Sequence, residues 1–293
     1  MKNVYEEITN RMIEQLEQGV IPWKKPWSGR RNGAVSYATG RPYSLINQMI
    51  LAKPGEYATF NQVKAAGGKV NKGAHAKIVV FWKVVPRELC DGSGQLVRDA
   101  DGNPVVQGLP VLRYFQVFHI LDDCTGIDPK WADAAPVTTP DDAADVFSAY
   151  IGRENISLQE EISDEAYYSP AMDLIHLPMM EQFDSAAEYF STAFHEAVHS
   201  AGHRSRLNRF EPSASAAAFG SESYSKEELV AEIGSACILH ELGIETPQTF
   251  KNSAAYVQSW LRALKNDKRL IVSATARAEK AVNLIFGESP AQQ

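Results

Sequence analysis

The sequence has 293 residues, of which 44% are hydrophobic and 22% are charged, and its formal net charge at pH 7 is −7. It is long enough for two domains with cores of their own, and it contains no apolar stretch that could cross a membrane. The first residues, MKNVYEEITNRM, do not resemble a secretory leader, so we expect a cytoplasmic protein without a membrane partner. Cys90, Cys124 and Cys237 are too few and too scattered for a disulfide framework or a cysteine-based zinc site.

Positive charge is concentrated in one part of the sequence. Between residues 18 and 83 there are eleven basic residues and a single acidic residue, Glu56. A basic segment in an otherwise acidic chain is typical of a module that binds a polyanion. The basic residues of this segment are Lys24, Lys25, Arg30, Arg31, Arg41, Lys53, Lys64, Lys69, Lys72, Lys77 and Lys83.

The chain is predicted to begin with an amphipathic helix over residues 4–18. Residues 21–33 (IPWKKPWSGRRNG) then form an irregular loop, because prolines and glycines interrupt any helix. In this loop aromatic rings alternate with cations, which suits a single nucleic-acid strand whose bases stack and whose phosphates need neutralising. The alternating residues are Trp23, Lys24, Lys25 and Trp27. The alternative is that both tryptophans fill a core beneath a surface loop.

Two short helices and two strands are expected next. The helices cover residues 45–50 and 59–66, and the strands cover residues 78–82 and 112–121, with an exposed excursion over residues 86–110. Helices followed by strands predict a small α+β domain. The candidate DNA contacts in this domain are Trp23, Lys24, Lys25, Trp27, Arg30, Arg31, Arg41, Tyr43, Asn47, Lys69, Lys72 and Lys77.

A segment with prolines and no periodicity, residues 128–142, is the best candidate for a linker. We therefore divide the chain into a DNA-binding domain (1–127), the linker, and a second α+β domain (143–293). Each of the two domains is long enough to bury a core of its own.

The second domain contains the motif HEAVH, an H-E-x-x-H pattern, within a helix predicted over residues 185–203. Residues four apart on a helix point the same way, so His195 and His199 can hold one metal ion. Glu196, rotated by about 100°, lies beside that ion and can take a proton from water there. A strand predicted over residues 166–177 precedes the helix, where zinc proteases pair an extended substrate with a strand edge. The alternative is two buried core histidines and an exposed glutamate.

A catalytic zinc site also needs a third protein ligand and an open position for water. A helix predicted over residues 225–242 offers Glu228 and Glu232, one turn apart. We favour Glu228 as the ligand and Glu232 as a carboxylate that supports a ligand imidazole. Because Ser225 and Glu228 also match a capping box, the alternative is that Glu228 caps the helix and Glu232 binds the metal. The expected ion is Zn²⁺, although such ligands also accept Mn²⁺ or Co²⁺.

Several long strings in both halves resemble the ArdC family of plasmid antirestriction proteins. They are PWKKPW, GRPYSLINQ, TFNQVKAAGGKVNKGAHAKIVVFW and FQVFHILD in the first half, and STAFHEAVHSAGHRSRLNR and YSKEELVAEIGSA in the second. The resemblance implies two α+β domains, a small N-terminal domain that binds single-stranded DNA and a C-terminal zincin-like metallopeptidase domain of the gluzincin type.

Carried over residue by residue, the resemblance places His195 and His199 on the metal histidines and Glu196 on the acid/base glutamate. Glu228 falls on the gluzincin-type glutamate. The sequence departs from the commonest family form within residues 197–201, at positions between and beside the ligands that we interpret as packing variation.

The resemblance implies an antirestriction protein that binds single-stranded DNA during plasmid conjugation and protects it from host type I restriction. We expect the H-E-x-x-H site to act as a zinc-dependent metallopeptidase on a bound protein, with a host restriction-system protein as a candidate partner. The alternative is a protein that only shields single-stranded DNA and whose metal is structural. A metal-dependent nuclease is disfavoured, because phosphodiester hydrolysis usually uses a carboxylate-rich pair of metals.

Overall fold

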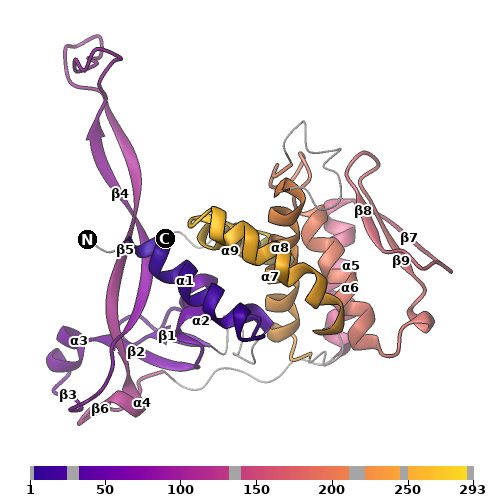
Figure 1. The fold of residues 1–293 in the computed structure, drawn as a ribbon, viewed down its shortest axis with the longest axis horizontal. Coiled ribbons are helices and arrows are strands. Elements are labelled where there is room, and N and C mark those ends of the chain that lie inside the picture. The colour runs from indigo at the N-terminus through magenta and orange to yellow at the C-terminus, as the bar shows by residue number, and fades with distance from the viewer. Residues whose placement is uncertain (1–2, 25–32, 132–139, 211–221, 245–249, 289–293) are drawn as a thin grey trace.

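The computed structural model describes residues 3–24, 33–131, 140–210, 222–244 and 250–288 (Figure 1). Its helices are α1 (Val4–Glu17), α2 (Leu45–Leu51), α3 (Phe60–Ala65), α4 (Ile120–Asp123), α5 (Pro140–Glu154), α6 (Ala186–Ser200), α7 (Glu222–Glu241), α8 (Phe250–Asn266) and α9 (Leu270–Ile285), with 3₁₀ turns η1 (Pro22–Lys24) and η2 (Met180–Gln182). Its strands are β1 (Ala34–Ser36), β2 (Gly55–Thr59), β3 (Lys69–Val70), β4 (Lys77–Glu88), β5 (Val106–His119), β6 (Cys124–Thr125), β7 (Ser157–Glu161), β8 (Tyr167–Ser169) and β9 (Leu174–Pro178).

The N-terminal half is built on a four-stranded sheet of order β1-β2-β5-β4. β1 pairs with β2 in parallel, and the other pairs are antiparallel. All twelve residues of β4 pair with β5, so the two strands form a ribbon that projects beyond the sheet (Figure 1). The ribbon therefore runs well into the stretch predicted to be an exposed excursion, and only residues 89–105 form its tip.

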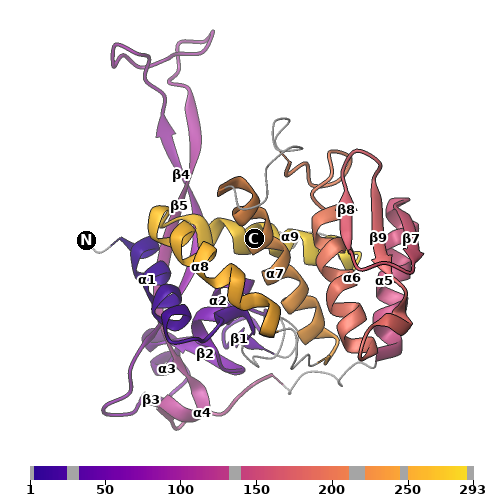
Figure 2. The same cartoon turned by 45° about the vertical axis from the view of Figure 1, so that its right-hand side comes forward.

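The C-terminal half places a three-stranded sheet of order β7-β9-β8 beside α6, with β8 and β9 in contact with that helix (Figure 2). α7 packs between α6 and α9, while α8 contacts α7 and α1. Of the helices in the described part of the chain, none has both the length and the apolar character needed to cross a bilayer. The predicted mixture of helices and strands in two α+β halves is confirmed.

The strand predicted over residues 166–177 is in fact a hairpin. β8 ends at Ser169, and the chain turns through Asp173, whose φ of 49° is left-handed, before β9 begins. β9 pairs with β7 on one side and β8 on the other, so it has no free edge. The prediction that the strand next to the motif helix presents an edge to substrate is therefore wrong for β9.

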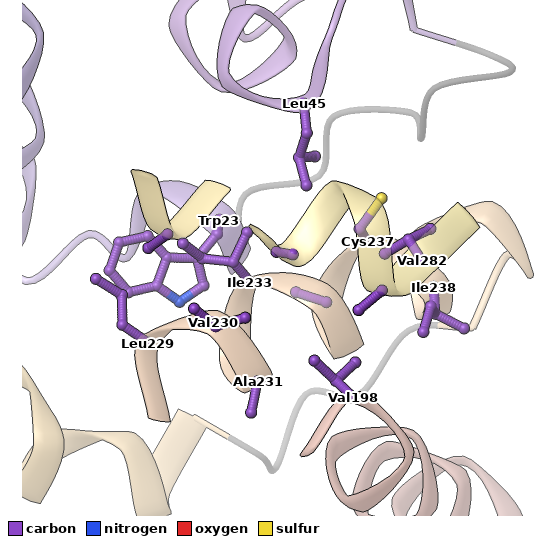
Figure 3. Packing of buried hydrophobic residues seen from close by; sticks show 14 of the residues in the cluster. Trp23, Leu45, Val198, Leu229, Val230, Ala231, Ile233, Cys237, Ile238 and Val282 are labelled. Carbon is purple, nitrogen blue, oxygen red and sulfur yellow. The ribbon is translucent and has the colours of Figure 1, made fainter. Parts of the chain in front are cut away.

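The two halves share one hydrophobic core. The largest buried cluster contains side chains of α1, η1 and α2 together with those of α6, α7, α8 and α9. Trp23 of η1 is fully buried, and its ring lies edge-on to Trp260 of α8 with 5.2 Å between centroids. Figure 3 shows Trp23 beside Leu229 and Ile233 of α7. The interface between the halves is thus packed like the interior of a domain.

This burial corrects one predicted DNA contact. A base can stack only on an exposed ring, and no surface of Trp23 is exposed. The sequence placed Trp23 on an irregular loop, but the short 3₁₀ turn at residues 22–24 directs its ring against α7 and α8. For Trp23 the alternative considered above, a tryptophan that fills a core, is the correct one.

Asn47 is a second predicted DNA contact that is buried. Only 3% of its surface is exposed. Its Nδ2 donates to the carbonyl oxygen of Val80, and its Oδ1 accepts from the backbone N–H of Val80, both at 2.7 Å. Asn47 therefore links α2 to β4 near the base of the ribbon. Its amide is fully used in these bonds and is not available to DNA.

We expect the Asn47→Ala substitution to lower the free energy of unfolding by about 2–4 kcal/mol, because it leaves the buried N–H and C=O of Val80 without partners. Chemical denaturation followed by circular dichroism measures this change. Asn10→Ala is the matched control, because the exposed Asn10 side chain accepts from the Lys268 ammonium and from no other residue in the described ranges. Equal stability of the two variants would contradict the role given to Asn47.

Candidate metal centre

The helix that carries the motif forms as its sequence predicts. Ser185 caps α6, since its Oγ accepts from the backbone N–H of Glu188 at 3.3 Å. The apolar stripe packs inward, and Phe194, Ala197 and Val198 are fully buried. This packing fixes the rotation of α6 and turns the motif histidines toward α7.

His195, His199 and Glu228 converge on one point. Nε2 of His195 lies 3.2 Å from Nε2 of His199. One Glu228 carboxylate oxygen is 3.5 Å from Nε2 of His195, and the other is 3.4 Å from Nε2 of His199. In the described part of the chain this is the only cluster of three histidine, cysteine or carboxylate groups close enough to hold a cation.

These separations can be compared with the dimensions of a zinc site. Four ligands at about 2.0–2.1 Å in a tetrahedron lie about 3.3–3.4 Å from one another. The distances among the three donor groups, 3.2 to 3.5 Å, are close to that value. Two imidazoles and a carboxylate are also a donor set that Zn²⁺ and Mn²⁺ accept. The residues present therefore fit a divalent cation.

Glu228 reaches the histidines because α7 packs very closely on α6. A Cβ atom at Gly234 would lie 2.8 Å from Cγ2 of Val198, so only glycine allows this approach. α7 begins at Glu222, three residues before Ser225, which rules out a capping box at Ser225. The competing reading of Glu228 as a helix cap is thereby removed.

A carboxylate that sequence reasoning missed supports His199. Glu227 lies 3.5 Å from Nδ1 of His199, on the far side of the ring from Glu228. Arg209 holds Glu227 in place, because its Nη2 donates to Glu227 at 2.5 Å and to the carbonyl oxygen of Val198 at 2.6 Å. Glu232 was predicted to support a ligand imidazole, but the carboxylate next to Nδ1 of His199 is that of Glu227. The only hint of this role in the sequence is that Glu227 directly precedes Glu228.

The pKa values of His195, His199 and Glu228 depend strongly on one another. Burial opposes protonation of His199, but hydrogen bonds to Glu227 and Glu228 outweigh it and raise the pKa of His199 to about 10. The pKa of His195 is raised as well, because its hydrogen bond to Glu228 outweighs its burial. Burial favours a neutral Glu228, yet hydrogen bonds from both imidazoles hold the pKa of its carboxyl far below the usual range. Without a cation, His199 therefore keeps its proton and Glu228 stays ionised.

Glu196 and Glu232 lie outside the converging set. Glu196 is on α6 and is 8% exposed, and it acts on both imidazoles through its charge. Glu232 is one turn beyond Glu228 on α7, and its charge acts on His195. Glu196 is thus close enough to the cluster to handle a proton there without occupying a ligand position.

The loop after α6 is tied back to the small sheet. Arg206 donates to both carboxylate oxygens of Asp173 and, through Nε, to the carbonyl oxygen of Ser200 at 2.8 Å. His203 contacts Ser205, with 2.7 Å between Nδ1 and Oγ, and stays outside the cluster. His176 is buried, with Nδ1 against the backbone carbonyl oxygen of Glu165 and Nε2 against a carboxylate oxygen of Glu161, as expected of a structural histidine.

The remaining predicted DNA contacts are dispersed. Arg41, Lys69 and Lys72 are exposed, whereas Lys77 is half-buried with its Nζ 3.9 Å from Asp123. Tyr43 is half-buried, and burial raises the pKa of its hydroxyl to about 12. The other candidates, Lys25, Trp27, Arg30 and Arg31, and the side chain of Lys24, lie outside the described residues.

Two family models match the chain. Residues 2–118 match the N-terminal domain of the anti-restriction factor ArdC, and residues 145–277 match a zincin-like metallopeptidase. A zincin-like domain implies a divalent metal. The order of the two matches is the order of the two halves described above.

Solved structures match over nearly the whole chain. The metal-free crystal structure of the antirestriction ArdC protein from plasmid R388 is 34% identical, with a TM-score of 0.74, and the match covers 97% of this chain and 96% of that one. The Mn(II)-bound structure of the same protein is 32% identical with the same TM-score, and 99% and 100% are covered.

Curated relatives include longer proteins. A DNA primase TraC of Escherichia coli is 34% identical over 97% of this chain, which spans only 27% of that protein. An uncharacterized protein, y4eC, of Sinorhizobium fredii (strain NBRC 101917 / NGR234) is 27% identical, and 98% of this chain and 92% of that protein are covered. From its two domain matches and its full-length likeness to the R388 protein, the chain belongs to the ArdC family of antirestriction proteins.

Proposed function

We propose that this chain binds single-stranded DNA during plasmid conjugation, protects it from host type I restriction, and hydrolyses a peptide bond of a bound host protein at the metal centre. The observation that carries the enzymatic part is the convergence of His195, His199 and Glu228 with a buried Glu196 beside them. A structural site has no use for a further carboxylate near its open side, whereas peptide hydrolysis needs one.

The division of labour that we propose follows the two halves of the chain. Residues 1–127 bind DNA and residues 143–293 carry the metal centre, and the ranges of the two family matches support this division. The start of the proposed linker is attached to the first half, because the backbone N–H groups of Lys130 and Trp131 donate to Glu56. An excess of positive charge in residues 18–83 supports a polyanion as the ligand of the first half.

In the proposed reaction, a bound cation would polarise the peptide carbonyl and lower the pKa of water. Glu196 accepts the proton of the attacking water and then delivers it to the leaving amine. Glu227 and Arg209 keep the His199 ring in one orientation, in which Nδ1 faces the Glu227 carboxylate and Nε2 faces Glu228, so that His199 and Glu228 would hold the cation together. The edge strands β7 and β8 remain as places where an extended peptide could pair, since β9 is fully paired.

The second candidate function is DNA shielding alone, with a structural cation. The shared hydrophobic core favours it, because a cation beside α6 and α7 would stabilise the helices that also support the N-terminal half. The two functions differ in whether Glu196 is needed.

We expect Glu228→Gln to lower the affinity for Zn²⁺ by more than about 100-fold, because the variant loses a ligand. Glu232→Gln, one turn along the same helix, should lower it by less than about tenfold. Competition with a chromogenic chelator measures both affinities. A larger loss for the Glu232 variant would make Glu232 the third ligand instead.

Zn²⁺ binding at pH 7–8 is expected to release at least one proton. The metal-free protein keeps a proton on His199, whose pKa is raised to about 10, and a cation binds only the neutral imidazole. Since the metal-free form holds more protons, apparent affinity should rise as the pH increases over this range. Titration calorimetry in buffers of different ionisation enthalpy reports the protons released, and a heat independent of the buffer would refute the coupling.

Conjugative transfer into a restricting recipient tests the enzymatic role of Glu196. We expect Glu196→Gln to abolish protection while Zn²⁺ and single-stranded DNA still bind, because only the proton carrier is removed. Glu188→Gln, the same substitution about two turns earlier on α6, is the control and should protect normally. Full protection by the Glu196 variant would leave DNA shielding as the function.

A further inference from the structure

The β4–β5 ribbon has two chemically different faces. Side chains alternate along a strand, and directly paired residues share a face, so the register separates the two sets. The cationic face is defined by Lys77, Val79, Phe81, Lys83, Val85 and Arg87 of β4 with Val117, Phe115, Arg113, Val111, Leu109 and Gln107 of β5. The opposite face carries Ile78, Val80, Trp82, Val84, Pro86 and Glu88 with Gln116, Tyr114, Leu112, Pro110, Gly108 and Val106.

The cationic face has four basic residues and no acidic one. Lys83, Arg87 and Arg113 are exposed, and none of them makes an ion pair with another described residue. Lys77, nearest the body, is the exception, with its ammonium 3.9 Å from Asp123. Three uncompensated cations on a projecting ribbon are typical of a surface that neutralises phosphates.

An aromatic platform lies among these cations. The rings of Phe81 and Phe115 stack with 4.7 Å between centroids and 7° between planes. Phe115 keeps 53% of its surface exposed, and Phe81 pairs directly with Arg113. Aromatic surface exposed to water is unfavourable in the protein without a ligand. An exposed ring beside a guanidinium is the arrangement on which nucleic-acid bases stack.

The platform also borders a cavity of about 590 Å³ between the base of the ribbon, α2 and α9. Phe81 and Phe115 line it together with polar side chains that include Tyr43 and Gln62. Glu279 is the carboxylate among its lining residues, and one of its oxygens accepts from the backbone N–H of Leu45 at 3.2 Å. The cavity falls within the range of about 300–1,000 Å³ that small organic groups occupy in proteins.

We propose that the cationic face of the β4–β5 ribbon binds the single-stranded DNA, with Phe81 and Phe115 stacking a base at the mouth of this cavity and Lys83, Arg87 and Arg113 contacting phosphates. The proposal rests on the DNA binding proposed above and gives it a place. It moves the main contact from the Trp23 loop to the ribbon, where Lys77 was the one DNA contact predicted from the sequence.

Charge and shape favour a single strand over a protein partner. A protein interface on this face would bury three cations that have no carboxylates beside them, whereas phosphates neutralise all three. Duplex DNA keeps its bases stacked inside and offers none to Phe115, so the aromatic platform has a use only for a strand with free bases.

Binding of a fluorescein-labelled oligo(dT) to the full chain, measured by anisotropy, tests the platform. Phe115→Ala should weaken binding about 5- to 100-fold, as the loss of one stacked base does. Tyr114→Ala is the matched control, since Tyr114 is the neighbouring residue on the other face and has 52% exposure against 53% for Phe115. With 2-aminopurine in the oligonucleotide, quenching on binding should be lost in the Phe115 variant and kept in the Tyr114 variant.

The charge contacts are tested by the salt dependence of the same binding. Lys83→Ala with Arg113→Ala should reduce the slope of log affinity against log salt by about 1.4, which corresponds to two phosphate contacts on a single strand. Arg11→Ala with Arg262→Ala removes the same charge from exposed positions of α1 and α8 and should leave the slope unchanged.

The outcomes separate this proposal from the function on which it rests. If the unsubstituted chain does not bind oligo(dT), DNA binding itself is refuted. If it binds, but the Phe115 and Tyr114 variants bind equally well and both double variants keep the slope, the site lies elsewhere and only the location is refuted. An equal loss in the two single variants also overturns it, because a face-specific platform requires a difference.

Discussion

The close contact between α6 and α7 at Gly234 is the constraint on which the candidate metal centre depends. Val198 fills the space that any side chain at residue 234 would occupy. This approach brings Glu228, on the same helix, within 3.5 Å of both motif imidazoles. Because α7 also packs against η1, α8 and α9, its position is set from several directions at once. The donor atoms are therefore already arranged before any cation arrives, which lowers the cost of ordering them on binding.

The sequence predicted those parts of the site that depend on local structure. The spacing of His195 and His199 and the cap at Ser185 specify α6 almost completely, because they involve contacts within one helix. The choice between Glu228 and Glu232 stayed open, since it depended on where α7 begins. Glu227 was missed altogether, because its role depends on Arg209, which arrives from the loop after α6.

Predictions for the N-terminal half failed where tertiary packing decided the outcome. A tryptophan beside lysines looks the same in sequence whether it faces water or a core, and the burial of Trp23 depends on Trp260, far along the chain. The length of the ribbon was underestimated because Pro86, Gly108 and Pro110 interrupt the alternation that identifies a strand. These residues are tolerated because a two-stranded ribbon needs ladder hydrogen bonds on only one side of each strand.

The shared core also bears on how the chain folds as it is synthesised. The Thr9 hydroxyl donates to the carbonyl oxygen of Lys268, across 259 residues of sequence. Trp23 likewise packs against the ring of Trp260, which is synthesised much later. A domain that is synthesised first usually folds first, but here α1 packs against α8, and η1 packs against α7 and α8. α1 is thus synthesised well before the helices it packs against, and until they emerge its apolar face is open to chaperones.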